Sequence, residues 1–367
     1  MTAVQRINAH SYELIILGNY AWTTNMQLEI ITTLDKFNAI AADWNQLLTT
    51  SATNVPFLRH EYLSAWWHML GGGEWPHGEL YIVIAQTEDG QLVAAAPLFL
   101  TKGSTGERVM MFLGSFEISD YLDFISPADQ LAPFLAALFA HLNGPDSPTW
   151  DVIDLYNILD HSNTPAELKI LAEKHNLLIN QEILKPAPRI ALASNWEDYL
   201  AGLQGKQRRE IRRKMKRAAT HFEPVTWYIV EQESSLDDEI DAFFQLMATA
   251  PEKDTFLTKV MISQMRSAVH TAFQAGWLQL AFIEINGEKA AAYLNFDYDN
   301  QIWVYNSGIN WKYRELSPGW VLLGHLIQWA IDNGRTAFDM MRGDEIYKYR
   351  FGGVDRFVTR VQIRRSP

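Results

Sequence analysis

The chain has 367 residues, too many for one ordinary hydrophobic core, and its length favours two domains of roughly 150–190 residues each. Its net charge of −12 argues against a surface built mainly for nucleic acid, and a content of 48% hydrophobic and 20% charged residues excludes wholesale disorder. The lack of cysteine excludes disulfides, thiolate metal sites and cysteine nucleophiles.

The N-terminal segment gives no sign of a membrane anchor or a leader peptide. No apolar run reaches the ~18 residues that span a bilayer, and the first residues carry too little charge and apolar length for a secretory signal. A cytoplasmic location is therefore expected. Residues 1–25 are expected to be a loose extension, with the first domain starting near Met26.

Two predicted β-hairpins share one plan, in which an Asx-Gly pair joins two apolar strands. They are residues 80–87 and 92–100 around Asp89-Gly90, and residues 278–285 and 289–296 around Asn286-Gly287. Such pairs suit type I′ turns, because both central residues of that turn need a positive φ.

The elements around each hairpin also repeat. Two helical patterns precede it, and it is followed by a strand, a helix opened by a proline-containing turn, and a short strand with one internal aspartate. In the first half these are residues 34–48, 59–70, 109–113, 128–142 and 152–155; in the second half they are 236–249, 256–275, 302–306, 318–332 and 337–340. Seven elements in the same order indicate a duplicated fold.

This order predicts an α/β (α+β) fold with two tandem domains, each a mixed, mostly antiparallel sheet flanked by helices. The join is placed near Pro186-Ala187-Pro188, where two prolines break both helix and strand ladder. The domains are then residues 26–185 and residues 186–367. Asp154 and Asp339 are expected on equivalent strands.

A basic segment, residues 206–217, has no counterpart in the first half. It contains eight basic residues and one acidic residue, with Ile211 and Met215 as a thin apolar stripe, which predicts a charged helix. One interpretation is a solvated surface helix. The other is a clamp for the phosphates of a cofactor, an RNA or a lipid head group, with Arg209 and Arg213 among the binding residues.

The predicted helix 318–332 begins with residues suited to anion binding. Ser317 is expected to be its N-cap, and Gly334 its C-terminal stop. Free N–H groups and the helix dipole attract anions there, Arg314 lies just upstream, and Gly319 would let a pyrophosphate approach the backbone. The alternative is an ordinary buried helix with ordinary caps.

The segment from Asp339 to Lys348 holds the densest polar chemistry of the chain. Asp339 lies in an apolar strand and should need a partner, with Arg342 or Lys348 as candidates. Carboxylates beside such cations can deprotonate an amine or hydroxyl and stabilise an oxyanion, which makes Asp344 a further candidate. The alternative is a salt-bridged turn.

In the first half, Asp120, Tyr121 and Asp123 follow the third strand and are candidates to bind an amine or sugar hydroxyls. A capping turn is the alternative interpretation. No metal site is expected, because the histidines lack metal-binding spacing, and no G-x-S-x-G nucleophile motif occurs.

Several of these motifs together resemble the CelD-like/FemAB-like branch of the GNAT acyltransferase superfamily. In the second half they are Lys206-x-Arg208-Arg209-x-x-Arg212-Arg213, Ser317-Pro318-Gly319 and Asp339-x-x-Arg342-Gly343-Asp344-x-x-Tyr347-Lys348. In the first half they are Pro56-Phe57, Trp66, Pro97-Leu98, Phe112-Leu113-Gly114 and Asp120-Tyr121-x-Asp123. The resemblance covers roughly residues 27–360 and implies two fused GNAT-like folds.

The resemblance implies an acyltransferase that moves an acyl group from acetyl-CoA or another acyl-CoA to a sugar, a cell-envelope precursor of a polysaccharide pathway or a small metabolite. Aminoacyl-tRNA is the alternative donor, and no other nucleic acid is expected as a partner. The residues fall into three expected groups: Arg314, Ser317, Gly319, Arg209 and Arg213 hold the donor; Asp120, Tyr121, Asp123 and Tyr347 hold the acceptor; Asp339, Arg342, Asp344 and Lys348 form the catalytic group. In that group Asp339 partners Arg342, Asp344 binds the acceptor, and Lys348 faces the thioester oxygen.

Two other functions stay open from the sequence. One is a non-catalytic, glycan-binding accessory protein of a polysaccharide pathway. The other is a polyanion-binding protein that acts through helix 206–217. Steeply salt-dependent RNA binding would favour the latter, and glycan binding without turnover the former.

Overall fold

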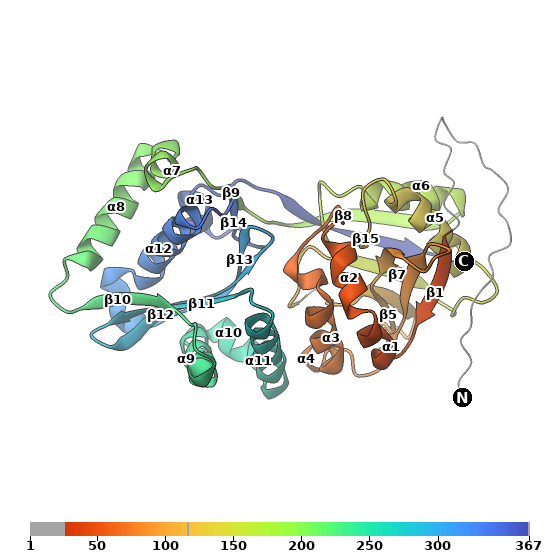
Figure 1. Cartoon of the computed structure of the whole chain (residues 1–367), viewed down its shortest axis with the longest axis horizontal. Coiled ribbons are helices and arrows are strands. Elements are labelled where there is room, and N and C mark those ends of the chain that lie inside the picture. Colours follow the sequence, from red (N-terminus) through yellow and green to blue (C-terminus); the bar gives the residue numbers. More distant parts are fainter. Residues whose placement is uncertain (1–25, 116, 366–367) are drawn as a thin grey trace. The chain divides into compact units, whose positions relative to one another are not determined.

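A computed structural model describes residues 26–115 and 117–365, and the chain divides into two compact units (Figure 1). The first unit runs to Leu184 and also includes the C-terminal segment from Val358, whereas the second unit is Lys185–Phe357. The predicted extension, residues 1–25, lies outside the described residues. Among the helices described, none has the length and apolar character needed to cross a membrane.

The described residues of the first unit form two sheets and six α-helices. The helices are α1 (Leu34–Ala39), α2 (Ala41–Leu48), α3 (His60–His68), α4 (Leu70–Gly73), α5 (Leu131–Leu142) and α6 (Thr164–Lys174). The strands are β1 (Gln27–Ile31), β2 (Glu79–Leu80), β3 (Ile82–Gln86), β4 (Leu92–Ala96), β5 (Leu98–Lys102), β6 (Arg108–Phe112), β7 (Val152–Leu159), β8 (Leu178–Pro186) and β15 (Phe357–Arg364). They form the sheets β1-β3-β4 and β2-β5-β6-β7-β15-β8. Pro97 separates β4 from β5, so the return strand predicted as one piece is two.

The second unit is one six-stranded sheet with helices on both faces. Its strands are β9 (Arg189–Ala191), β10 (Val225–Ile229), β11 (Leu278–Ile285), β12 (Glu288–Tyr298), β13 (Gln301–Ile309) and β14 (Ala337–Asp339), in the order β10-β11-β12-β13-β14-β9. Its helices are α7 (Trp196–Gly202), α8 (Gly205–Ala219), α9 (Leu236–Met247), α10 (Pro251–Phe256), α11 (Lys259–Gln274), α12 (Pro318–Asp332) and α13 (Ile346–Arg350). Helices α9, α10 and α11 lie on one face, and α12 lies on the other with α7 and α8 (Figure 1).

The duplicated plan predicted from the sequence is present in the strand pairing. In each unit a helix connects two neighbouring parallel strands, β6 to β7 through α5 and β13 to β14 through α12. The second strand then pairs antiparallel with β15 or β9. Asp154 lies on β7 and Asp339 on β14, so their placement on equivalent strands is confirmed. Each pairs with an arginine, Asp154 with Arg360 at 2.7 Å and Asp339 with Arg356.

The C-terminal end of the chain does not lie where the sequence analysis placed it. We expected residues 186–367 to form the second domain, but β15 pairs with β7 of the first unit, and residues from Val358 on belong to that unit. An alternating apolar pattern predicts a strand without indicating which sheet receives it, because long-range pairing decides that.

The two hairpin turns differ from each other. Asn286 and Gly287 both have positive φ, 53° and 77°, which confirms the type I′ prediction in the second unit. In the first hairpin Gly90 has a φ of 86° but Asp89 does not have a positive φ, so the same prediction is wrong there. The reason is a longer loop, closed by the N–H of Thr87 donating to the carbonyl of Gln91 at 3.0 Å.

Helix α9 approaches β13 so closely that only glycine fits at position 308. A Cβ on Gly308 would lie 2.5 Å from the carbonyl carbon of Leu246 and 2.6 Å from the nitrogen of Met247, both backbone atoms. The Thr249 hydroxyl donates to the Ile309 carbonyl at 2.7 Å and fixes the same contact. The end of α9 is therefore anchored to the end of β13, which positions the following helix α10.

We expect Gly308→Ala to lower the free energy of unfolding by about 1–3 kcal/mol, because the methyl group must push α9 away from the strand. Urea denaturation followed by tryptophan fluorescence measures the change. Gly202→Ala is the matched control: no atom lies within 4 Å of a Cβ there, so it should change stability by less than about 0.5 kcal/mol. Equal stability of the two variants would contradict the close contact.

Candidate active site

Strands β13 and β14 separate shortly after they begin to pair. Their parallel register covers only Gln301–Trp303 with Ala337–Asp339; β13 then continues to Ile309 with β12 as its described neighbour, and the chain leaves β14 at Met340. The β12–β13 register also shifts between Leu294 and Asn295. Ligands in α/β sheets collect where the carboxyl ends of strands open in this way, and bulges often adjoin such sites.

Lys253 extends from α10 to the far part of β13. Its ammonium group donates to the Asn306 side-chain oxygen at 2.8 Å and to the Ser307 carbonyl at 2.5 Å. The Asn306 oxygen also accepts from the N–H of Ser307 at 2.8 Å. The lysine is half-buried, and burial lowers the pKa of Lys253. Sequence reasoning missed this residue because its surroundings on α10 show no motif.

Lys348 organises the loop that follows β14. Its ammonium group donates to the carbonyls of Met341, Arg342 and Gly343 at 3.1, 2.7 and 3.4 Å, and it forms an ion pair with Glu345 at 2.9 Å. The side chain is only 3% exposed. We expected Lys348 to face a thioester oxygen, but its hydrogen bonds go to the loop itself. Its visible role is to hold the loop in shape.

Asp339 is fully buried and holds the base of this loop. Its carboxylate accepts from the N–H of Met341 at 2.9 Å and forms an ion pair with Arg356. Sequence analysis named Arg342 and Lys348 as candidate partners and did not consider Arg356, which follows α13. A buried carboxylate needs such compensation, so Asp339 acts as an anchor. Arg342 is half-buried, and Asp344 is exposed.

Glu345 is exposed, pairs with Lys348, and acts electrostatically on several polar side chains. Burial raises the pKa of Tyr293 and of Tyr347. The charge of Tyr347 and then that of Glu345 add to the effect on Tyr293, and the charge of Glu345 adds to that on Tyr347 and also acts on Lys253. Tyr293 on β12 lies opposite Ser307 in the strand register, and its side chain packs in the core with residues of α12. Within the described residues, the hydroxyls of both tyrosines and the side-chain NH₂ of Asn306 make no hydrogen bond.

We call Lys253, Tyr293, Asn306, Glu345 and Tyr347 the mouth cluster. It supplies a carboxylate, an ammonium group, an amide and two hydroxyls, which can orient and deprotonate an amine or hydroxyl. Tyr347 was a sequence candidate, and Glu345 lay inside the loop that the sequence indicated. Of the other three, Lys253 and Asn306 meet at β13, and Tyr293 lies on the neighbouring strand with its side chain in the core beside α12.

The start of α12 differs from the predicted cap. Ser317 does occupy the N-cap position, but in the left-handed region with a φ of 53°, and its side chain makes no capping hydrogen bond. Gly319 is buried, and a Cβ there would lie 2.9 Å from the Ile309 side chain, so packing on β13 already requires the glycine. Arg314 is exposed beside Glu315 at 3.7 Å.

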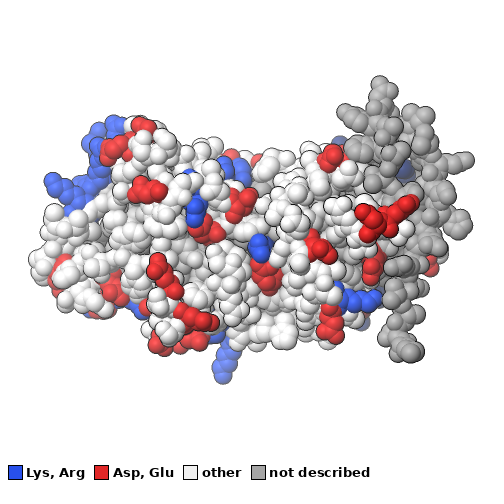
Figure 2. All heavy atoms as spheres, viewed as in Figure 1, with Lys and Arg blue, Asp and Glu red and all other residues white. Residues whose placement is uncertain are grey.

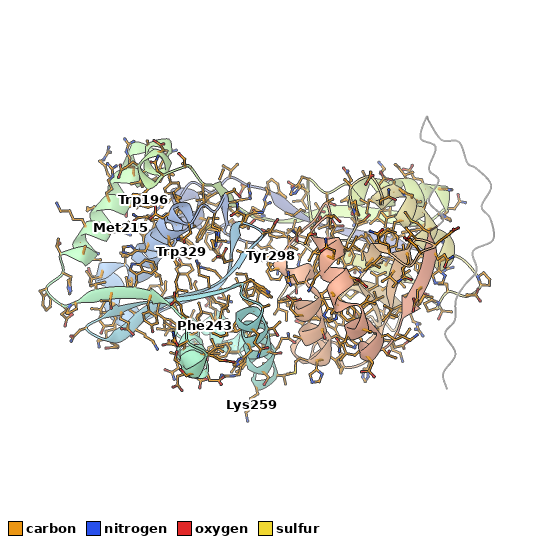
Figure 3. All side chains as sticks on the ribbon, viewed as in Figure 1. Trp196, Met215, Phe243, Lys259, Tyr298 and Trp329 are labelled. Carbon is orange, nitrogen blue, oxygen red and sulfur yellow. The ribbon has the colours of Figure 1, made fainter. Side chains whose placement is uncertain are left out.

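Basic side chains nevertheless gather at the first turn of α12. Lys214 of α8 lies 4.1 Å from the ring centre of Trp320, and Arg350 of α13 lies 6.0 Å from it. The apolar stripe of α8 faces α12, where the Met215 sulfur would be 3.0 Å from a Cβ on Gly324 (Figure 3). This contact fixes α8 along α12 and places Lys214 beside the helix start.

The outward face of α8 is strongly basic. Arg209 and Arg213 are exposed there, and Arg212 forms an ion pair with Glu197 of α7. Figure 2 shows Lys and Arg side chains gathered over this helix. The predicted helix is confirmed, with bounds of Gly205–Ala219. Its expected role in phosphate binding stays a prediction.

In the first unit the candidate acceptor residues are buried. Asp123 accepts hydrogen bonds from the hydroxyls of Thr53, Ser162 and Thr164 at 2.8, 2.6 and 2.5 Å and from the N–H of Phe124 at 2.8 Å. Burial raises the pKa of Asp123. These internal bonds fit the capping turn better than an acceptor contact, which corrects the expectation for Asp123. Asp120 and Tyr121 are buried in the same loop.

That loop lies across the place in the first unit that corresponds to the opening between β13 and β14. Ile125 pairs with Ala95 of β4, and the Asn157 side chain of β7 donates to the Ser119 carbonyl at 2.9 Å. The first unit's own chain therefore covers the ends of β6 and β7. Among the described residues of the chain, no group of three His, Asp or Glu side chains could hold a metal ion.

Comparison with known proteins defines the class of this fold. Residues 205–349 match the family model described as an acetyltransferase (GNAT) domain, and no curated protein matches the sequence significantly. The structure is similar to FemX, with a TM-score of 0.61 and 10% identity over 90% of this chain and 96% of that one.

Two further solved structures are similar over most of their length. L-PGS from Bacillus licheniformis gives a TM-score of 0.51 and 13% identity over 90% of this chain and 91% of that one. A tandem GNAT protein from the clavulanic acid biosynthesis pathway gives a TM-score of 0.50 and 12% identity over 91% of this chain and 98% of that one. The second unit is thus a GNAT domain. The whole chain has a fold similar to those of FemX and of the tandem GNAT protein, and the GNAT acetyltransferase domain in its second unit supports an acyltransferase.

Proposed function

We propose that the second unit transfers an acyl group from acyl-CoA to an amine or hydroxyl of a sugar, a cell-envelope precursor or a small metabolite. The observation that carries the proposal is the early separation of β13 and β14 in a GNAT domain, together with the basic side chains at the start of α12. A cytoplasmic location, where acyl-CoA is available, is part of the proposal. The covered strand ends of the first unit favour the second unit as the site of transfer.

The start of α12 suits the phosphates of the donor. The Ser317 side chain does not cap this helix, so the N–H groups that follow Pro318 and the helix dipole can act on an anion. The dipole contributes only about 0.3–1 kcal/mol, so nearby cations must add to it. Lys214 and Arg350 lie beside Trp320 at this turn and can supply that charge.

The mouth cluster suits the acceptor. In direct transfer, the acceptor's nitrogen or oxygen bonds to the acyl carbon, the carbon–sulfur bond breaks, and the CoA sulfur leaves as a thiolate that takes up a proton. Glu345 can receive the acceptor's proton, while Lys348 holds its carboxylate in place at 2.9 Å. Positioning of the two substrates can supply roughly 7–11 kcal/mol of the barrier reduction.

The donor site is tested by Lys214→Ala. We expect the affinity for acetyl-CoA, measured by isothermal titration calorimetry, to fall about tenfold, which corresponds to about 1.4 kcal/mol for a lost charge-assisted contact. Lys216→Ala is the matched control, since that lysine is exposed on the same helix. If both variants bind acetyl-CoA as the wild type does, the phosphates lie elsewhere.

The exposed basic face of α8 supports a second candidate donor, aminoacyl-tRNA. RNA binding through Arg209 and Arg213 would weaken steeply with salt. The slope of the logarithm of the binding constant against the logarithm of the salt concentration would fall in magnitude by about one for each arginine removed. Binding of RNA with that dependence, together with no detectable acetyl-CoA binding, would favour this donor over acyl-CoA.

A further inference from the structure

Lys253 is a half-buried cation without a matching anion. Among the described residues, no carboxylate lies within 4.0 Å of its ammonium group; Glu252 and Glu345 act on it only from farther away. Its two partners, the Asn306 side-chain oxygen and the Ser307 carbonyl, are both neutral. Burying a charge without compensation costs free energy, which an anionic ligand would recover.

The position of this ammonium group is fixed by the fold. An ammonium group has three N–H donors, and two go to β13, which leaves one for a ligand. The helix that carries Lys253 follows α9, whose end is anchored to β13 at Gly308 and by the Thr249 hydroxyl. A binding group held in this way loses little conformational entropy when a ligand arrives.

The groups around Lys253 have hydrogen-bonding capacity that the described residues leave unused. The NH₂ of Asn306, whose side-chain oxygen accepts from Lys253, is available, whereas the Glu345 carboxylate already accepts from Lys348. The ammonium group and this amide can both donate to a carboxylate, which has about four lone-pair sites. Glu345 remains beside them for a neighbouring amine.

We propose that Lys253 binds a carboxylate of the acceptor, so that the acceptor is an amine that also carries a carboxylate, such as an amino acid or the end of a peptide. This inference rests on the proposed acyl transfer and specifies the chemical class of its acceptor. In the competing account Lys253 only fastens α10 to β13. That account predicts a loss of stability on substitution without any preference among ligands.

The proposal is tested by binding of product-like probes, which needs no turnover. The N-acetyl derivatives of glycine, alanine, glutamate and lysine are each compared with their carboxamides by calorimetric titration at matched ionic strength. Wild type should bind carboxylates in preference to carboxamides, and Lys253→Met should bind the carboxylates at least about tenfold more weakly. Lys259→Met, at an exposed lysine of α11 that points away from the unit (Figure 3), should behave as wild type.

Two further variants separate binding from folding. Lys253→Gln keeps a donor for Asn306 and Ser307 without the charge and should also lose the preference, whereas Lys253→Arg should retain most of it. The proposal is overturned if wild type shows no preference for any carboxylate, or if the folded Met or Gln variant keeps it. Failure of acetyl transfer with an intact preference would instead count against the proposed reaction alone.

Discussion

Glu345→Gln is expected to lower turnover about 10²–10⁴-fold, the usual contribution of a general base, while leaving the fold and acetyl-CoA affinity unchanged. Glutamine keeps the length of the side chain and an oxygen that can accept from Lys348, so the loop can retain its shape. What is lost is the charge beside Lys253, Tyr293 and Tyr347. Steady-state release of CoA measures the effect.

The neighbouring carboxylate provides a stringent comparison. The sequence favoured Asp344 as the acceptor-binding residue. Both carboxylates are exposed in the structure, but Glu345 pairs with Lys348 at 2.9 Å and its charge acts on Tyr293 and Tyr347. Asp344→Asn should therefore reduce turnover far less than Glu345→Gln. If Asp344→Asn shows the larger loss of turnover, Asp344 and not Glu345 is the carboxylate that acts on the acceptor.

Asp339→Ala is expected to lower the free energy of unfolding by about 3–5 kcal/mol, because it leaves the Arg356 guanidinium without its buried partner. It also removes the acceptor for the N–H of Met341 at the start of the loop. Urea denaturation at neutral pH followed by tryptophan fluorescence measures the change.

An exposed ion pair in the same unit is the control for this substitution. Asp237 pairs with Arg266 at 2.8 Å with 69% of its side chain exposed, and Asp237→Ala should cost less than about 1 kcal/mol. Comparable losses in the free energy of unfolding would show that the buried Asp339 pair stabilises the unit no more than an exposed one. Asp339 would then not be an anchor of the loop.

Local chemistry made much of the fold predictable. The Asn286-Gly287 pair can adopt positive φ at both positions, and Pro318 and Gly334 delimit α12 correctly, because a proline suits the first turn and a glycine the left-handed stop. The order of elements predicted the duplicated plan. The internal aspartates marked equivalent strands because each interrupts an apolar run that the sheet buries.

The rest depended on contacts between distant segments. The strand that ends at Arg364 carries no sign that it pairs with β7, and Arg356 reaches Asp339 only once α13 has turned the chain back. Lys253 reaches Asn306 because α9 docks on β13 at Gly308, a contact without a sequence signature. Ser317 failed as a cap because the preceding turn places it in the left-handed region.

The most direct test of acyl transfer by the second unit is mass spectrometry of a small-molecule extract incubated with isotopically labelled acetyl-CoA. With wild-type protein, we expect the label to appear on an acceptor that becomes heavier by one acetyl group. With Glu345→Gln, the same product should form about 10²-fold more slowly. Equal labelling by the two proteins, or no labelled product with the wild type, would contradict transfer through the opening between β13 and β14.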